Sequence, residues 1–282
     1  RARNPSGRIV ALSDIHGQYE LMVQLLRANG VIDAKNRWKL GRDQLVLTGD
    51  VFDRGPRVTE VFWLLQQLQE QARKAGGAVH FLLGNHETMV LYDDLRYVNP
   101  KYLQVAEKLG LSHAALYAKD TYLGQWLRSR PVMLRLGDTL FLHGGIAPEN
   151  IDLATDMEAT NQAYRDSRGT PKAELKADPR LARLYDGKKS PIWYRGYFDG
   201  ALDTAQVAAL LKKLGVARIV VGHTSMQHVS SFHDGRVIAI DSSIKQGESG
   251  ELLFIENGVT SRGMLDGTRQ PLAEGKVESD ED

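Results

Sequence analysis

The sequence predicts an α/β fold in which two mixed β-sheets pack together as a β-sandwich flanked by helices. Five short apolar runs each end in a glycine-rich cluster that holds Asp, His or Asn. Residues at helical spacing separate the first three runs, and after residue 218 short apolar segments alternate with turn residues. Buried strands read as continuous apolar runs, and their alternation with helices favours parallel pairing through right-handed crossovers.

The apolar runs give the expected strands. They are Ile9–Leu12, Leu45–Leu47, Phe81–Leu83, Leu140–Leu142 and Ile219–Val221. Runs of this length bounded by glycine are typical of buried strands. Ligands of open α/β sheets lie beyond the carboxyl ends of the strands. The polar residues behind the five runs are therefore expected to form one site assembled from the whole chain.

Two helices are expected between the first three strands. Apolar residues at helical spacing predict one helix over residues 19–28 and another after Pro56. Gly76-Gly77 is expected to end the second helix near Ala75, because glycine is the usual residue just past a helix. The chain up to the third strand therefore has the order β-α-β-α-β.

The middle and the end of the chain have a different character. Residues 88–135 interrupt the alternation and are expected to form a helical insertion over or beside the site. Residues 150–190 are polar, which predicts exposed helices and loops. From residue 218 on, turns such as Asp234-Gly235 and Asn257-Gly258 predict hairpins. These strands are expected to form a second, more antiparallel sheet packed on the first.

Length and composition limit the class of protein. The motifs run through one stretch of the 282 residues, so we predict a single domain over residues 1–265 and an acidic, disordered tail over residues 266–282. A net charge of +1 gives no reason to expect a nucleic acid, and no apolar run reaches the roughly 20 residues of a membrane span. The absence of cysteine excludes disulfides, thiolate catalysis and cysteine-bound zinc.

The start of the chain bears on location. The first residue is Arg1 rather than Met, just before the first strand. A processed chain of this kind favours a periplasmic or secreted protein. A start trimmed by design would look the same, so a cytoplasmic protein stays open.

The strand-end side chains predict a site for two divalent metal ions. Such a pair, about 3.5–4 Å apart, needs a bridging carboxylate and further nitrogen and oxygen ligands. Asp50 is the natural bridge because it follows the second strand. The first ion is expected to bind Asp14, His16 and Asp50, and the second Asp50, Asn85, His143 and His223. Manganese is the first expectation for this mixed oxygen and nitrogen set, with iron and zinc as alternatives.

Each of these clusters has a simpler explanation when taken alone. Asp-x-His after a strand is usually a turn, and Asn tolerates turns as well. Their combination favours the metal site, since four of the eight histidines fall at the strand ends. Asp241 is a candidate for a place beside the metal ligands, but a plain strand-to-turn residue is the stronger expectation. A structural role is expected for the other histidines, which are His80, His113, His228 and His233.

The motifs resemble those of the calcineurin-like metallophosphoesterases and, more narrowly, the phosphoprotein phosphatase superfamily. That pattern reads Gly-Asp-x-His-Gly, Gly-Asp-x-Val-Asp-Arg-Gly, Gly-Asn-His-Glu, His-Gly-Gly and Gly-His, and the chain matches it in order over roughly residues 8–258. Ser13 and Phe52 replace the usual Gly and Val. The chain lacks the eukaryotic Ser-Ala-Pro-Asn-Tyr-Cys-Gly segment and has its own stretch Ser190–Tyr197. These features resemble the bacterial-type branch named Shewanella-like protein phosphatases, of which some members prefer phosphotyrosine.

The resemblance implies the metallophosphoesterase fold and a direct hydrolysis of phosphomonoesters. In that reaction a hydroxide that bridges the two metals attacks phosphorus in line. Arg54 and Arg195 are the expected phosphate clamps, because a guanidinium binds phosphate in bidentate fashion, and Asn85 is a further candidate. His86 is the expected general acid for the leaving group, with Asp53 orienting it and keeping it protonated.

The leading prediction is thus a metal-dependent protein phosphatase that acts on phosphoproteins or phosphopeptides carrying phosphotyrosine, phosphoserine or phosphothreonine. The alternative is a hydrolase of small-molecule or dinucleoside polyphosphates that uses the same site. An inactive binding module is disfavoured, because the ligand set, Arg54 and His86 are all intact. Several aromatic residues are candidates for a phosphotyrosine pocket, although core packing explains each of them: Trp193, Tyr194, Tyr197, Tyr92, Tyr97 and Tyr102. The oligomeric state cannot be predicted.

Overall fold

Four of the five apolar runs lie within strands of the computed structural model, which describes residues 7–276, and the remaining run begins at the last residue of a strand. β1 (Ile9–Leu12), β2 (Gln44–Leu47) and β3 (Ala78–Phe81) pair in parallel in one sheet. β5 (Thr139–Leu142) and β6 (Arg218–Val221) pair in parallel in the other. The predicted strands are confirmed, with the third ending at Phe81, before the last residues of its run.

Each sheet has six strands within the described residues. Their orders are β11-β10-β9-β1-β2-β3 and β12-β7-β8-β6-β5-β4. The remaining strands are β4 (Met133–Leu136), β7 (Ser230–Phe232), β8 (Val237–Ala239), β9 (Leu252–Glu256), β10 (Val259–Gly263), β11 (Arg269–Gln270) and β12 (Ala273–Glu274). Parallel and antiparallel pairs occur in both sheets, so the predicted fold class of two mixed sheets is confirmed.

The strands after residue 218 do not form a sheet of their own. β6, β7, β8 and β12 lie in the second sheet, whereas β9 pairs antiparallel with β1 and extends the first. A second sheet does pack on the first as expected, but it is not the more antiparallel of the two, and it does not take in β9. Without β9, the edge of β1 next to the core would be unpaired, and an unpaired buried edge is costly. The buried strand β9 covers this edge and therefore joins the first sheet. The turn residues in the sequence predict where these strands lie, but not which strands they pair with.

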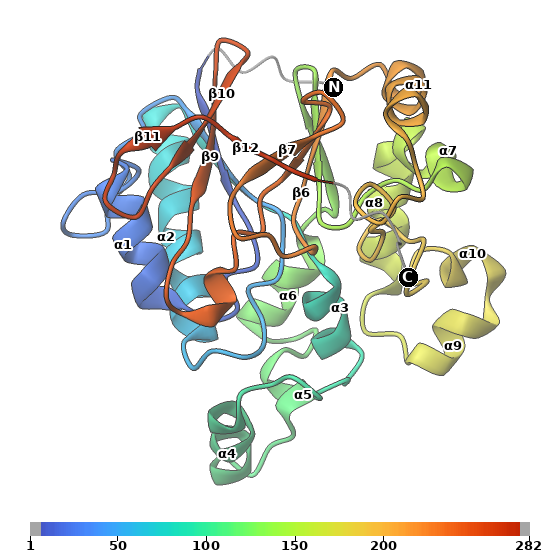
Figure 1. The fold of residues 1–282 in the computed structure, drawn as a ribbon. Coiled ribbons are helices and arrows are strands. Elements are labelled where there is room, and N and C mark those ends of the chain that lie inside the picture. Colours follow the sequence, from blue (N-terminus) through green and yellow to red (C-terminus); the bar gives the residue numbers. More distant parts are fainter. Residues whose placement is uncertain (1–6, 277–282) are drawn as a thin grey trace.

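The two sheets pack face to face around a shared apolar layer (Figure 1). Alternate residues of β1 point to its two faces, and both faces are buried. Fully burying one such aliphatic side chain contributes roughly 1.5–3 kcal/mol. The layer between the sheets includes Ile9, Ala11, Val46, Phe141, Val220, Ile238 and Leu253.

Helices cover the outer faces of the sandwich. α1 (Tyr19–Ala28) and α2 (Val58–Ala75) lie against the first sheet, where both were predicted. Gly76 ends α2 in the left-handed conformation, at φ 81°. The other helices are α3 (Asn85–Leu91), α4 (Pro100–Lys108), α5 (His113–Leu116), α6 (Tyr122–Ser129), α7 (Ile151–Thr155), α8 (Met157–Ser167), α9 (Lys172–Ala177), α10 (Pro179–Ala182) and α11 (Thr204–Leu214).

The predicted insertion over residues 88–135 is helical, since it holds most of α3 and all of α4, α5 and α6. Its predicted end is wrong, because β4 begins at Met133 and forms a hairpin with β5. Residues 150–190 form helices as expected. Not all of that region is exposed, because Tyr164 of α8 is fully buried.

The predicted tail starts too early. β11 and β12 lie within residues 266–276, and β12 pairs in parallel with β7. A hydrogen bond from Arg262 Nε to the Pro271 carbonyl, at 2.7 Å, also ties this segment to β10. The last part of the predicted acidic tail, residues 277–282, lies outside the described residues. Within residues 7–276 no helix combines the length and the apolar character of a membrane span.

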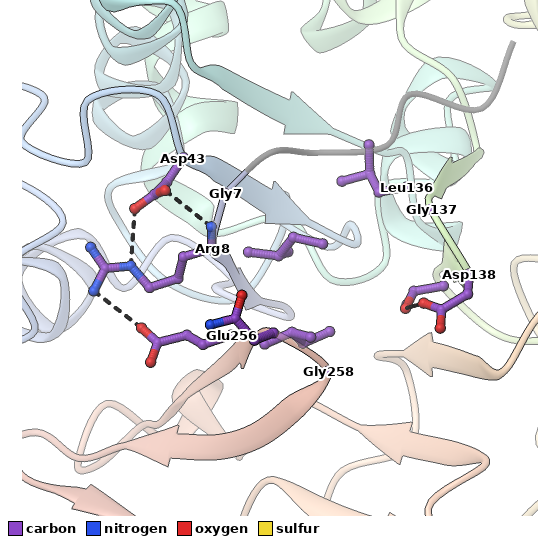
Figure 2. A pocket seen from close by; sticks show the side chains of 12 residues that line it. Gly7, Arg8, Asp43, Leu136, Gly137, Asp138, Glu256 and Gly258 are labelled. Carbon is purple, nitrogen blue, oxygen red and sulfur yellow. Dashed lines mark hydrogen bonds and ion pairs between the residues drawn. The ribbon is translucent and has the colours of Figure 1, made fainter.

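A wide cavity of about 830 Å³ opens at the amino end of β1 and β2 (Figure 2). Arg8 is fixed there by Asp43, through its backbone N–H and its Nε, both at 3.0 Å. Its Nη1 also lies 3.2 Å from Glu256 Oε1. None of the predicted site residues lines this cavity.

Candidate metal centre

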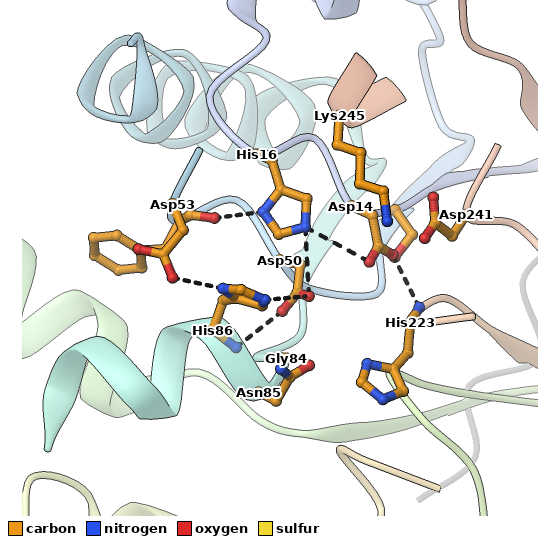
Figure 3. A network of polar contacts seen from close by, with 12 residues as sticks. Asp14, His16, Asp50, Asp53, Gly84, Asn85, His86, His223, Asp241 and Lys245 are labelled. Atoms are coloured by element: carbon orange, nitrogen blue, oxygen red, sulfur yellow. Dashed lines mark hydrogen bonds and ion pairs between the residues drawn. The ribbon is translucent and has the colours of Figure 1, made fainter. Parts of the chain in front are cut away.

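The six predicted metal ligands gather at the carboxyl ends of the strands, and Figure 3 labels all of them except His143. Asp14 and His16 follow β1, Asp50 follows β2, and His143 and His223 follow β5 and β6. Asn85 opens α3. All six side chains are buried. The five strand ends therefore form one site, as the sequence predicts.

Asp50 lies at the centre of the cluster. Its Oδ2 is 3.1 Å from His143 Nε2 and 3.7 Å from His16 Nε2. His143 Nε2 is also 2.9 Å from Asn85 Oδ1. Two groups of potential metal ligands meet at Asp50, one with His16 and His86 and one with His143 and His223. A carboxylate shared between two ligand groups is what a dimetal site requires.

The backbone of the site is strained in a systematic way. Twelve non-glycine residues of the described chain have positive φ, and half of them belong to the site. These six are Asp14 (53°), His16 (45°), Asp50 (56°), Asp53 (74°), Arg54 (64°) and His223 (65°). Such conformations cost on the order of 1–3 kcal/mol each and persist only where the surroundings enforce them.

Hydrogen bonds between the strand-end loops enforce this geometry. The Asp14 N–H donates to the Gly49 carbonyl and the His16 N–H to the Asp50 carbonyl, both at 3.0 Å. Glu87 accepts four backbone N–H groups, from Gly84, Asp50, Val51 and Phe52, at 2.7 to 3.1 Å. Sequence reasoning gave Glu87 no role, although its place in Gly-Asn-His-Glu was a signal.

Two glycines are needed because ligands approach their backbone. A Cβ on Gly84 would lie 2.2 Å from Asp50 Oδ1, and one on Gly222 would lie 2.5 Å from Asp14 Oδ2. Both distances are too short for any side chain. The two glycines therefore allow the backbone to approach the ligand side chains closely.

The histidines are oriented to leave one nitrogen free. His16 Nδ1 lies 2.7 Å from the Phe52 carbonyl and His143 Nδ1 lies 2.8 Å from the Thr48 carbonyl. A carbonyl requires Nδ1–H as donor, which turns Nε2 toward the cluster as a ligand. His223 Nε2 is buried and has no hydrogen-bond partner among residues 7–276. An orphaned buried nitrogen is costly, and a bound cation would satisfy it, so the residues fit a metal.

Charges within the cluster are strongly coupled. Burial lowers the pKa of His16 to about 3, so this imidazole is neutral at pH 7 and has a lone pair for a metal. Burial also lowers the pKa of His143, but Asp50 and Asp14 outweigh it and raise the pKa to about 10. Burial raises the pKa of Asp50, but His143 and His86 outweigh it and hold it well below its usual value. Without a cation, a proton on His143 balances the carboxylates.

His86 and Asp53 form a pair beside the cluster. His86 Nδ1 lies 2.5 Å from Asp53 Oδ2, and both side chains are buried. Burial lowers the pKa of His86, but Asp50 and Asp53 outweigh it and hold the pKa above its usual value. The structure thus places His86 next to Asp53, in surroundings that favour the protonated imidazole.

A small cavity of about 140 Å³ opens onto the cluster. Arg54 and Arg195 are exposed at its rim, as expected of residues that meet a substrate. Sequence reasoning missed Lys245, which also lines the cavity and whose Nζ is 2.5 Å from Ser225 Oγ. No motif distinguishes this lysine in the sequence.

Only part of the aromatic set lies at the site. Tyr97 and Trp193 line the cavity. Tyr197 is fully buried, and its hydroxyl donates to the Ile146 carbonyl at 3.1 Å, so core packing explains it. Tyr194 is also buried against the core, and Tyr102 packs under α2.

The remaining polar candidates fall into two groups. Asp241 is fully buried, accepts from Ser225 Oγ at 2.6 Å and helps to raise the pKa of Asp14, an effect that burial dominates. It therefore lies beside the cluster, contrary to the expectation of a plain turn residue. The other histidines bind elsewhere: His80 to Gln44, His228 to Glu251 and His233 to the Tyr197 carbonyl, while His113 packs on Tyr117.

Comparison with known proteins agrees with this geometry. Residues 7–227 match the model of the calcineurin-like phosphoesterase family. The chain belongs to this family and is a phosphoester hydrolase.

Three relatives narrow the comparison. The crystal structure of a cold-active protein-tyrosine phosphatase from a psychrophilic Shewanella superposes with a TM-score of 0.93, at 45% identity, over 96% of this chain and 82% of that one. Shewanella-like protein phosphatase 2 of Arabidopsis thaliana is 28% identical over 85% of this chain and 72% of its own length. An uncharacterized protein of Schizosaccharomyces pombe is 32% identical over 86% and 75%. The predicted branch of the family is confirmed.

Proposed function

We propose that this protein is a metal-dependent phosphoprotein phosphatase with phosphotyrosine among its substrates. The observation that carries the proposal is the shared position of Asp50 in two ligand groups, with two exposed arginines that line the same cavity. The Shewanella relative, a protein-tyrosine phosphatase by name, supports the substrate class.

Six side chains would hold the metals. Asp14, His16 and Asp50 would bind one ion, and Asp50, Asn85, His143 and His223 the other. Bound in this way, two divalent ions would lower the pKa of a water molecule and polarise the phosphoryl oxygens. We propose manganese, because the set mixes carboxylate, amide and imidazole ligands without sulfur.

Arg54 and Arg195 would bind the phosphoryl group. Both arginines line the cavity, and a guanidinium group has planar donor pairs. Asn85 would contact the same group from the floor, since its side chain also lines the cavity. The arginines would stabilise the charge that develops on the phosphoryl oxygens during hydrolysis.

His86 would protonate the leaving oxygen. Asp53 fixes the imidazole through Nδ1, which leaves Nε2 directed to the cavity side, 3.9 Å from Asp50 Oδ2. Burial lowers the pKa of His86, but Asp50 and Asp53 outweigh it and hold the pKa above its usual value, which favours the protonated imidazole that a general acid needs.

A substrate panel tests the function. The metal-loaded protein is assayed on one peptide sequence carrying phosphotyrosine, phosphoserine or phosphothreonine, and on diadenosine tetraphosphate. The proposal expects the highest kcat/KM on a phosphopeptide, with phosphotyrosine hydrolysed. A preference for the dinucleotide would favour the small-molecule alternative, and failure on all phosphopeptides would contradict the proposal.

A further inference from the structure

The geometry points to Asn99 as a positioning residue that holds Arg54 in place for phosphate binding. This inference rests on the proposed role of Arg54 in phosphate binding. Asn99 stands in the helical insertion, 45 residues away from Arg54 in sequence. We name residues 97–102 the clamp segment, because they are bonded to the loop that presents Arg54.

The clamp segment contacts this loop at several points. The Arg54 N–H donates to the Tyr97 carbonyl at 2.8 Å, and Asn99 Nδ2 donates to the Arg54 carbonyl at 2.8 Å. The clamp segment therefore holds both the N–H and the carbonyl group of Arg54. Two residues after Arg54, the Pro56 carbonyl accepts hydrogen bonds from Lys101 Nζ and the Tyr102 hydroxyl, at 2.7 and 2.9 Å.

Arg54 requires such support because of its backbone conformation. Asp53 and Arg54 both have positive φ, 74° and 64°, which L residues adopt only when neighbours enforce it. The Arg54 side chain has a further contact in the clamp segment, since Cζ lies 5.2 Å from the centre of the Tyr97 ring. An Arg54 backbone released from the clamp segment would aim its guanidinium elsewhere.

Asn99 suits this task because its carboxamide does two things at once. Its Oδ1 accepts the Lys101 N–H at 3.0 Å and caps α4, while its Nδ2 donates to Arg54. Asp and Ser also cap helices well, but neither offers the amide donor. Substitution by either residue therefore removes the bond to Arg54 and keeps the cap.

A double-mutant cycle tests the inference. Asn99→Asp and Asn99→Ser are made in the wild-type and in the Arg54→Ala background, and the metal-loaded proteins are assayed with an aryl phosphate. The second variant adds no charge beside Arg54. In the wild-type background we expect kcat/KM to fall about tenfold and the inhibition constant of inorganic phosphate to rise similarly, the effect of one lost hydrogen bond to a critical group. In the Arg54→Ala background we expect a change below about twofold, because residues that act through one another are not additive.

Ser112→Ala is the matched control. Ser112 caps α5 in the same insertion by accepting the Ala115 N–H, and it does not touch the loop of Arg54. It should lower the melting temperature without changing kcat/KM or phosphate inhibition. Metal content should stay at the wild-type level in all of the variants.

These experiments can distinguish a failure of the role inferred for Asn99 from a failure of the proposed phosphatase function. An equal loss in both backgrounds, or no loss in the wild-type background, would overturn the role of Asn99 and leave the phosphatase proposal intact. If Arg54→Ala itself left phosphate inhibition unchanged, the proposed role of Arg54 would fail and the inference with it.

Discussion

The two ends of the β-sandwich use charged residues in opposite ways. At the amino end, Arg8 pairs with Asp43 and Glu256, and these side chains stay partly exposed around a wide cavity. At the carboxyl end, Asp14 and Asp50 are buried together on strained backbone, beside a smaller cavity. The charged side chains around the wide cavity form ordinary surface ion pairs, in which Arg8 lies next to Asp43 and Glu256.

This difference shows which observations indicate function. Paired, exposed charges are common and contribute little, whereas buried carboxylates that face one another are costly unless something compensates them. The carboxyl end also concentrates positive-φ residues and contains the orphaned nitrogen of His223. Strain and unsatisfied polar groups, rather than cavity size, identify the site.

The largest expected effect comes from removing a metal ligand. Asp14→Asn and His143→Ala should each abolish phosphatase activity together with metal content, because the first removes a negative charge from the ligand cluster and the second removes a ligand nitrogen. Elemental analysis and an aryl phosphate assay measure both. Asp43→Asn, the same chemical change as Asp14→Asn at the amino end, should leave activity and metal content unchanged. Full activity in either ligand variant would contradict the site.

A smaller effect is expected from Arg54→Ala. The loss of a charged hydrogen-bonding group to phosphate should lower kcat/KM by roughly 10- to 100-fold, since such bonds are worth about 1.5–3 kcal/mol. Both metals should remain bound. Arg8→Ala, the corresponding change at the amino end, should leave kcat/KM at the wild-type value. Metal loss in Arg54→Ala would instead assign Arg54 a structural role.

The pH dependence of metal binding should follow His143. In the metal-free protein its pKa is raised to about 10, so it is protonated at pH 7.5, whereas a metal ligand must be neutral. Metal binding should therefore release a proton, and affinity should rise with pH. By the same linkage, the stability that protonated His143 gives the metal-free protein is complete below about pH 6.5 and is lost as pH rises toward 10. Calorimetry of metal binding in two buffers of different ionisation enthalpy measures the proton, and a release of zero would refute this assignment.

The smallest effect should be on stability at the amino end. Arg8 and Asp43 are about one third and one fifth exposed, so solvent screens their ion pair. Asp43→Asn should cost roughly 0.2–1 kcal/mol, the range of exposed pairs. Urea denaturation of the metal-loaded protein measures it. A loss above about 3 kcal/mol would show that the amino end is more than ordinary surface.

Local sequence was sufficient for the strands, the two helices and the positions of the site side chains, because each ligand lies within a few residues of the end of a strand. Local sequence was insufficient wherever the structure depends on strand pairing or hydrogen bonds between segments that are far apart in the chain. The pairing of β9 with β1, the four N–H groups at Glu87 and the bond from Asn99 to Arg54 all join residues that are far apart. The end of the insertion and the start of the tail were misplaced for the same reason, since β4 and β12 are defined by the strands they pair with.

Titration of the metal-free protein with manganese, compared with Asp50→Asn, tests the central claim most directly. We expect two ions per chain for the wild type and the loss of tight binding at both positions in the variant, because Asp50 belongs to both ligand groups. Binding of two ions to Asp50→Asn with wild-type affinity would contradict the shared site.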